Sequence, residues 1–207
     1  MRSHKVLSCL LVSAMIIFGA AVGHAQVSGT IWQGDTSSNA DSPILTGPSA
    51  NFTATGIDFD SRVTGYTPFL FLNSPTFTGA SATFAPNGSL DNSHILLTGT
   101  IYLSAGANAF DVAHDDGLNI TLNGGIGTVL DVPGPTSPVL TPFTITATTA
   151  GLYTYTLNYN ECCGPPAVLV WEYPTGAPVG SVPEPCTMLL MGTGLVGLAA
   201  YRKFKKI

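Results

Sequence analysis

Two adjacent aspartates, Asp115 and Asp116, are the first residues in this chain whose type and spacing point to chemistry. They lie in the stretch FDVAHDDGLNITLNGG, where apolar residues alternate with polar ones on both sides of the pair. This period of two predicts two half-buried β-strands with the aspartates at the bend between them. Because adjacent like charges repel each other, the pair needs a structural or a functional reason. The structural reason is a turn, in which one aspartate caps backbone N–H groups and Gly117 supplies a positive φ.

Other residue patterns that carry catalysis are absent from the sequence. It has no G-x-S-x-G elbow, no H-E-x-x-H pair and no glycine loop of the kind that cradles phosphate. A glycosidase needs two carboxyl groups on either side of the bond that it cuts. Glu161 and Glu172 are the only glutamates between residues 26 and 182, and both belong to the same late strand pair. We therefore expect a protein that is not an enzyme.

The first 25 residues have the pattern of a secretory signal peptide. They begin with the basic residues Arg2 and Lys5 and continue with an apolar run from Val6 to Val22. Small residues, Gly23 and Ala25, occupy the two positions that a signal peptidase reads. We expect cleavage after Ala25 and export of the rest of the chain; an uncleaved membrane anchor is the alternative.

The last 25 residues form a second targeting pattern. It starts with the motif Val182, Pro183, Glu184 and Pro185. The 17 residues from Pro185 to Tyr201 are uncharged, and four basic residues follow before the end. About 17–25 apolar residues span a bilayer, and a basic tail holds such a helix with its C-terminus in the cytoplasm. The segment 183–207 therefore predicts a short transmembrane helix.

This C-terminal segment resembles the PEP-CTERM sorting signal of Gram-negative bacteria, which has a Pro-Glu-Pro motif, a short transmembrane helix and a basic tail in this order. The resemblance implies an inner-membrane intermediate that an exosortase, a membrane transpeptidase, recognises and cuts at the motif. Release to the cell surface or to an exopolysaccharide matrix would follow. Cys186 departs from the pattern, since Ser or Ala is more frequent there.

Cys162 and Cys163 are neighbours in the stretch NECCGPPA. Cysteines of an exported protein are expected to oxidise. We favour a disulfide between the two; free thiols, bridges between chains and a bond to Cys186 are the alternatives. A zinc site is not expected, because His94 and His114 lie on separate predicted strands and no Cys/His spacing fits one.

The charge of the segment between the two signals restricts its partners. Residues 26–182 contain one basic residue, Arg62, and eleven acidic ones, so that their formal charge is about −10. Binding to nucleic acid through neutralisation of phosphates is therefore excluded. The charge favours a domain that binds cations or is simply soluble outside the cell.

Short apolar alternations bounded by Gly, Pro or Asn recur along the middle of the chain and predict an all-β fold, an antiparallel, jelly-roll-like β-sandwich. The predicted strands are VSGTIWQ from Val27, NFTATGIDF from Asn51, PFLFL from Pro68, HILLTGTIYLS from His94, AFDVAH, LNITLN, FTITATT from Phe143, LYTYTLNY from Leu152 and AVLVWEY from Ala167. We predict that this domain covers residues 26–173. A Pro/Gly linker, residues 174–182, would join it to the sorting signal.

Residues 98–173 resemble the protective-antigen-type β-sandwich that bacterial toxins, some glycosidases and yeast flocculins share. The matching residues are Asp115, Asp116, Gly117, Asn123, Gly124, Tyr159, Glu161, Gly164, Ala167, Leu169 and Trp171. In the sugar-binding flocculins two aspartates joined by a cis peptide hold Ca²⁺, with an Asn from a later loop, and the metal contacts sugar hydroxyls. The resemblance thus implies a Ca²⁺ site at Asp115 and Asp116, with Asn160 or its rival Glu161 as a further ligand.

Three classes of function follow from these observations. The resemblance and the acidic turn favour a surface or matrix module that binds carbohydrate. The low charge and the Thr-, Gly- and Ser-rich composition suit a purely structural matrix protein, which is the alternative. An enzyme comes last.

Overall fold

Ten β-strands and two short helices make up residues 26–180, the part of the chain that this computed structural model describes. The strands are β1 (Val27–Gln33), β2 (Ser49–Ala54), β3 (Asp58–Asp60), β4 (Ser93–Leu103), β5 (Gly106–Asp115), β6 (Leu118–Leu122), β7 (Gly127–Val132), β8 (Val139–Ala147), β9 (Gly151–Glu161) and β10 (Val168–Glu172). The helices are α2 (Ser61–Thr64) and α3 (Pro68–Phe71). The predicted signal peptide, the Pro-Glu-Pro motif, Cys186 and the predicted transmembrane helix lie outside the described residues. Within residues 26–180 no helix has the length and apolar character needed to cross a membrane.

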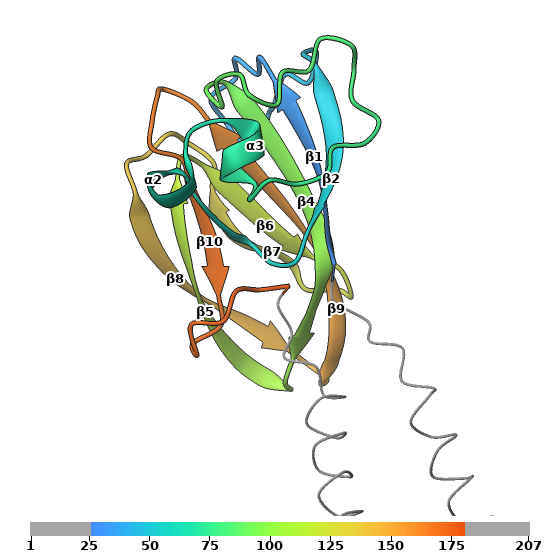
Figure 1. Ribbon diagram of the computed structural model, residues 1–207. Coiled ribbons are helices and arrows are strands. Elements are labelled where there is room, and N and C mark those ends of the chain that lie inside the picture. The colour runs from blue at the N-terminus through green and yellow to red at the C-terminus, as the bar shows by residue number, and fades with distance from the viewer. Residues whose placement is uncertain (1–25, 181–207) are drawn as a thin grey trace, which may run out of the picture. The chain divides into compact units, whose positions relative to one another are not determined.

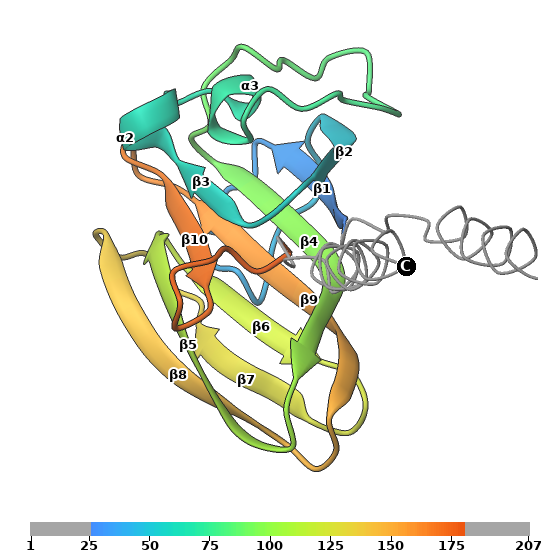
Figure 2. The same cartoon turned by 60° about the horizontal axis from the view of Figure 1, so that its bottom comes forward.

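The strands form two antiparallel sheets that pack face to face (Figures 1 and 2). The larger sheet has six strands in the order β2-β1-β4-β9-β6-β7, and the smaller has four in the order β3-β10-β5-β8. This arrangement confirms the predicted all-β sandwich. Strands β5 and β6 are consecutive in the chain but belong to different sheets, so the turn between them crosses from one layer to the other.

The core lies between the sheets because, in most strands, apolar residues alternate with others and face inward. In β4, for example, Ile95, Leu97 and Ile101 are fully buried. Trp171 of β10 is also fully buried, and its ring lies 5.0 Å from that of Tyr155 and 6.0 Å from that of Phe110, measured between centroids.

Three local predictions differ from the structure. The segment NFTATGIDF was predicted as one strand, but it runs from β2 into β3, which belong to different sheets. The segment PFLFL was predicted as a strand, but its first four residues form helix α3. Thr67 caps this helix by accepting the N–H of Leu70, and Pro68 occupies an early position where its missing N–H costs nothing. The last difference is β7, which was not predicted because its sequence lacks a clear alternation of apolar and polar residues. It is the edge strand of the larger sheet, and none of its residues is fully buried.

The predicted linker also needs correction for residues 174–180. These residues turn back onto the smaller sheet, where the N–H of Val179 donates to the carbonyl of Trp171 (2.7 Å). The carbonyl of Val179 in turn accepts the N–H of Ile57 (2.9 Å), and the Val179 side chain is fully buried in the core. A flexible linker would not bury an apolar side chain, so the domain extends at least to residue 180.

Candidate functional site

The two predicted aspartates line a cleft of about 410 Å³ at one end of the sandwich. Three segments meet there: the turn between β5 and β6, the segment that leads into β8, and the loop from β9 to β10, which is orange at the top left of Figure 1. The lining residues are Asp115, Asp116, Pro135, Thr136, Ser137, Pro138, Cys162, Cys163, Gly164, Pro165 and Pro166. The structure thus brings the aspartate pair and the cysteine pair, which are far apart in sequence, into one site.

Asp116 connects the two sides of the cleft by hydrogen bonds. Its Oδ2 accepts the backbone N–H of Cys162 at 2.7 Å, and its Oδ1 accepts that of Thr136 at 3.1 Å. Its carbonyl oxygen lies 2.7 Å from Nδ1 of the buried ring of His114. One carboxylate therefore holds the loops on both sides of the cleft. This is the capping role that the structural interpretation of the pair predicted.

Asp115 has a different environment, although the cis peptide bond that the sequence resemblance implied joins it directly to Asp116. Its carbonyl accepts the hydroxyl of Tyr159. Burial and the negative charge of Asp116 raise the pKa of the Asp115 carboxyl to about 6, and the more distant charge of Arg62 opposes them only in part. Among the described residues no Lys, Arg or His forms an ion pair with either aspartate. The cleft therefore holds two buried carboxyl groups that no basic side chain of the described residues pairs with.

Glu161 lies behind this pair, on the inner face of β9, and is fully buried. Its Oε1 accepts the hydroxyl of Tyr66 at 2.7 Å, and its Oε2 lies 2.7 Å from the hydroxyl of Tyr159. Tyr159 has one hydrogen and also donates to the carbonyl of Asp115, so a protonated Glu161 satisfies both contacts by donating to Tyr159. Burial is the main reason that the pKa of Glu161 rises to about 9, and the charges of the two aspartates add to it.

Asn160 projects from the opposite, outer face of β9 because side chains alternate along a strand. Its backbone N–H donates to the carbonyl of Gly117 (2.9 Å), and its Nδ2 donates to Asp35 (2.9 Å). Its Oδ1 is buried and has no hydrogen-bond partner among the described residues. Neither Asn160 nor Glu161 lines the cleft, and their roles as metal ligands stay predictions.

Cys162 and Cys163 are bonded to each other, as the sequence analysis favoured. Cys162 is buried beside the carboxylate of Asp116, whereas Cys163 is exposed on the cleft wall with a positive φ of 71°. Downstream, the N–H of Gly164 donates to Asp91 at 3.3 Å, and a cis bond joins Pro165 to Pro166. A disulfide and two prolines leave this loop few conformations, so the cleft has a stiff wall on this side.

The solved structures that resemble the described domain include two PA14 domains. The first is the crystal structure of the PA14 domain of the MpAFP antifreeze protein, with 21% identity, a TM-score of 0.55, and coverage of 73% of this chain and 84% of that one. The second is the PA14 sugar-binding domain from an RTX adhesin, with 20% identity, a TM-score of 0.52, and coverage of 75% and 94%. The described domain has the PA14 fold. This confirms the predicted protective-antigen-type sandwich.

The predicted resemblance of the C-terminal segment to the PEP-CTERM sorting signal is confirmed independently. Residues 181–203 match the PEP-CTERM protein-sorting motif. None of the curated protein sequences matches the chain.

Within the PA14 fold, Gly117 is required for a reason that differs from the predicted one. A positive φ was expected there, but Gly117 is not among the residues that have one. The carbonyl of Pro133 lies against its Cα instead, and a Cβ would overlap with that oxygen. Gly117 therefore serves the close approach of two backbones rather than a left-handed turn.

Sequence reasoning missed several residues that build the site. Thr136, Asp35 and Tyr66 belong to segments without a strand pattern, and they are 20 to 125 positions away from their partners in sequence. The stretch PGPTSP was recognisable as a rigid loop, and Thr136 lies within it. For Asp35 and Tyr66 no local signal exists, since their roles depend on the packing of the PA14 domain.

Proposed function

We propose that this chain is an exported surface or matrix protein whose PA14 domain binds carbohydrate through Ca²⁺ held by Asp115 and Asp116. The observation that carries the proposal is the pair of buried carboxyl groups in an open cleft, with no cationic side chain of the described residues in an ion pair with either. Two carboxylates in such a place are a good binding site for a divalent cation.

The donor atoms suit calcium. Ca²⁺ binds oxygen ligands, chiefly carboxylates, carbonyls and amide oxygens. The only close polar partner of the Asp115 carboxyl among the described residues is Asp116, so that its oxygens are available. Asp116 keeps lone pairs free besides the two that accept N–H groups. Asn160 has an unpartnered Oδ1, and its backbone N–H donates to Gly117 beside the pair. Its side chain does not line the cleft, so its role as a ligand rests on the sequence resemblance.

A bound Ca²⁺ would offset the two negative charges and offer coordination positions to the hydroxyl groups of a sugar. The residues of the chain itself provide the rest of the site. Asp116 keeps both flanking loops in place, and the exposed Cys163 with Pro165 and Pro166 presents a stiff, largely apolar wall on which a sugar ring can pack. The similar PA14 domain from an RTX adhesin is a sugar-binding domain, which supports a ligand of this class.

We assign no catalytic activity to this domain. Glu161 is fully buried and held between two tyrosine hydroxyls, so it cannot reach a substrate in the cleft. The PEP-CTERM motif supports export, processing by an exosortase-type transpeptidase, and a final location at the surface or in the matrix of a Gram-negative bacterium.

The experiment measures glycan retention and thermal unfolding of the full-length chain with millimolar Ca²⁺ and with EDTA. We expect Ca²⁺ to raise the melting temperature and to be required for retention on a glycan array. Asp115→Asn should abolish both effects. Asp111→Asn, the same change in charge on β5 and outside the cleft, is the control.

Ca²⁺-independent retention that Asp115→Asn does not affect would overturn the calcium part of the proposal. The absence of any retained glycan together with an unchanged melting temperature would overturn the whole proposal and favour the structural matrix protein.

A further inference from the structure

A row of hydroxyl side chains crosses the outer face of the six-stranded sheet from one edge to the other. Directly opposite residues of neighbouring strands project from the same face. The register places one Ser or Thr on every strand along a single line: Thr53 (β2), Ser28 (β1), Thr98 (β4), Thr156 (β9), Thr121 (β6) and Thr128 (β7). At about 4.8 Å between strands, the row is about 24 Å long.

Most of these hydroxyls have little to bind within the protein. Among the described residues, the side chains of Thr53, Ser28 and Thr156 have no hydrogen-bond partner. The contact from Thr98 to the carbonyl of Ser28 is long, at 3.5 Å. The neighbouring row is different, because Thr30 donates to Asn51 at 2.9 Å. The hydroxyl row therefore keeps donors and acceptors that are free to bind another molecule.

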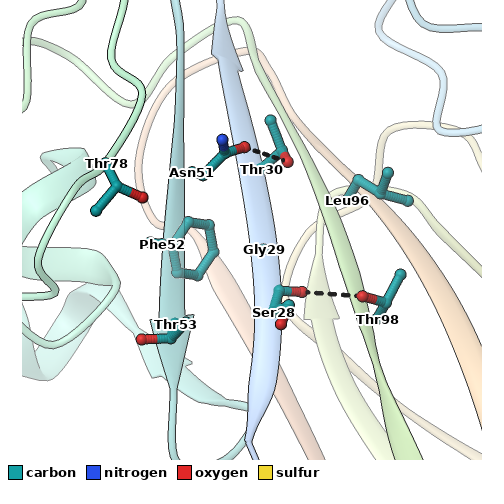
Figure 3. A pocket seen from close by; sticks show the side chains of 9 residues that line it. All are labelled: Ser28, Gly29, Thr30, Asn51, Phe52, Thr53, Thr78, Leu96 and Thr98. Atoms are coloured by element: carbon teal, nitrogen blue, oxygen red, sulfur yellow. Dashed lines mark hydrogen bonds between the residues drawn. The ribbon is translucent and has the colours of Figure 1, made fainter.

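The row begins in a hollow of about 250 Å³ over β2, β1 and β4 (Figure 3). Figure 3 shows Thr53, Ser28 and Thr98 side by side across these strands, with Asn51, Thr30 and Leu96 as the next row. A second hollow, of about 400 Å³, contains Thr154 and Asn123 at the lower end of the same face. Further along β4, Tyr102 projects from this face as well and is 51% exposed.

The hydroxyl row itself is uncharged, although the domain is strongly acidic. Of the described side chains that alternate onto the outer face of β2, β1, β4, β9 and β6, none is acidic, Lys or Arg. The one histidine, His94, is buried, and burial lowers its pKa. Carboxyl groups from other segments contact this face beside the row: Asp35 accepts the side-chain N–H of Asn160, and Asp41 accepts that of Asn119. Asp131 follows on the edge strand β7. The row offers no charge to pair with an anionic or a cationic partner, whereas its hydroxyl groups can form hydrogen bonds with a neutral partner that is rich in hydroxyls.

We propose that the outer face of the six-stranded sheet is a second binding surface, which takes an extended neutral polysaccharide without a metal. The length of the row favours a chain of sugar units over a single sugar. The unpartnered hydroxyls supply hydrogen bonds, and the exposed ring of Tyr102 offers an apolar face to a sugar. This surface lies on a different face from the acidic cleft, and its occupation does not depend on the function proposed for the cleft.

The test is affinity electrophoresis of the full-length chain in mild detergent, through gels that contain hydroxyethylcellulose, dextran or pullulan, with alginate as the anionic comparison. EDTA is present throughout, so that a calcium-dependent cleft contributes nothing. We expect at least one neutral polymer, but not alginate, to retard the wild type. The double variant Thr98→Val/Thr156→Val keeps shape and strand preference but removes two hydroxyls. It should weaken retardation roughly tenfold or more.

The control is Thr144→Val/Thr146→Val, two exposed threonines on β8 of the other sheet. It should leave retardation unchanged. If the first variant unfolds, Thr53→Val/Thr128→Val at the two edges of the sheet replaces it. Absence of retardation by all three neutral polymers, equal loss in the control, or a change only in self-association of the chain would overturn the proposal.

Discussion

Replacement of Asp115 by Asn separates the two interpretations of the aspartate pair. The pKa of this carboxyl rises from 3.8 to about 6 in the folded protein because of burial and the adjacent Asp116. Each unit corresponds to about 1.4 kcal/mol, so the ionised side chain destabilises the metal-free fold by up to about 3 kcal/mol above pH 6. Asparagine has the same shape and no charge. In EDTA at pH 7.5 the Asp115→Asn variant should therefore be more stable than the wild type.

The sign of this effect depends on pH and on calcium. A raised pKa means that the contribution of Asp115 to stability is complete below pH 3.8 and lost as the pH rises through 6. The advantage of the variant should thus vanish near pH 4. Saturating Ca²⁺ should stabilise the wild type and not the variant, which reverses their order at pH 7.5.

The assay is chemical or thermal unfolding of both proteins in EDTA and in Ca²⁺, where about 3 kcal/mol corresponds to roughly 6–12 °C in melting temperature. Asp111→Asn controls for the change in net charge. Asp116→Asn should behave in the opposite way and lose stability in both solutions, because both oxygens of Asp116 accept backbone N–H groups. If Asp115→Asn loses the same stability in EDTA as in Ca²⁺, Asp115 only anchors the turn, and our reasoning about its charge is wrong.

Two further predictions concern residues next to the pair. Glu161, whose pKa is raised to about 9, should make the metal-free protein less stable as the pH rises from 4.5, by about 3 kcal/mol at pH 7. Glu161→Gln should flatten this decline in stability in unfolding experiments at pH 4.5, 6 and 7.5. An equally steep decline in the variant would contradict our inference that the Glu161 carboxyl is protonated in the folded protein. Gly117→Ala forces a Cβ against the carbonyl of Pro133 and should cost on the order of 2 kcal/mol or more in chemical unfolding; a neutral effect would mean that the two backbones separate easily.

The sequence predicted most of the sheets because their strands alternate strictly between core and solvent, as in Leu118, Ile120 and Leu122 of β6. It did not predict β7, since an edge strand with partly exposed residues on both faces has no such alternation. The segment after Thr67 has apolar residues that suit either a strand or a helix. The combination of an N-cap residue with the following Pro68 was the sequence signal for the helix.

For the site, residues could be predicted but their assembly could not. The aspartate pair and the cysteine pair were visible as local patterns in the sequence. Both lie within residues 98–173, the part of the chain that resembles the protective-antigen-type sandwich. The two bonds of Asp116, to Thr136 and Cys162, depend on how loops from both sheets meet. The burial of Glu161 between Tyr66 and Tyr159 likewise follows from packing and not from its neighbours in the sequence.

The position of β9 in the larger sheet determines when this domain can fold. β9 is the second-last strand in the chain, yet it lies between β4 and β6 and pairs with both. Until residues 151–161 have emerged, β2-β1-β4 and β6-β7 remain separate ribbons with unpaired edges. Pairings between distant segments slow folding, since the loop must close before they form. The chain therefore reaches its native sheet only when nearly all of it is available, and a partner that covers the edges of β4 and β6 would keep it unfolded until then.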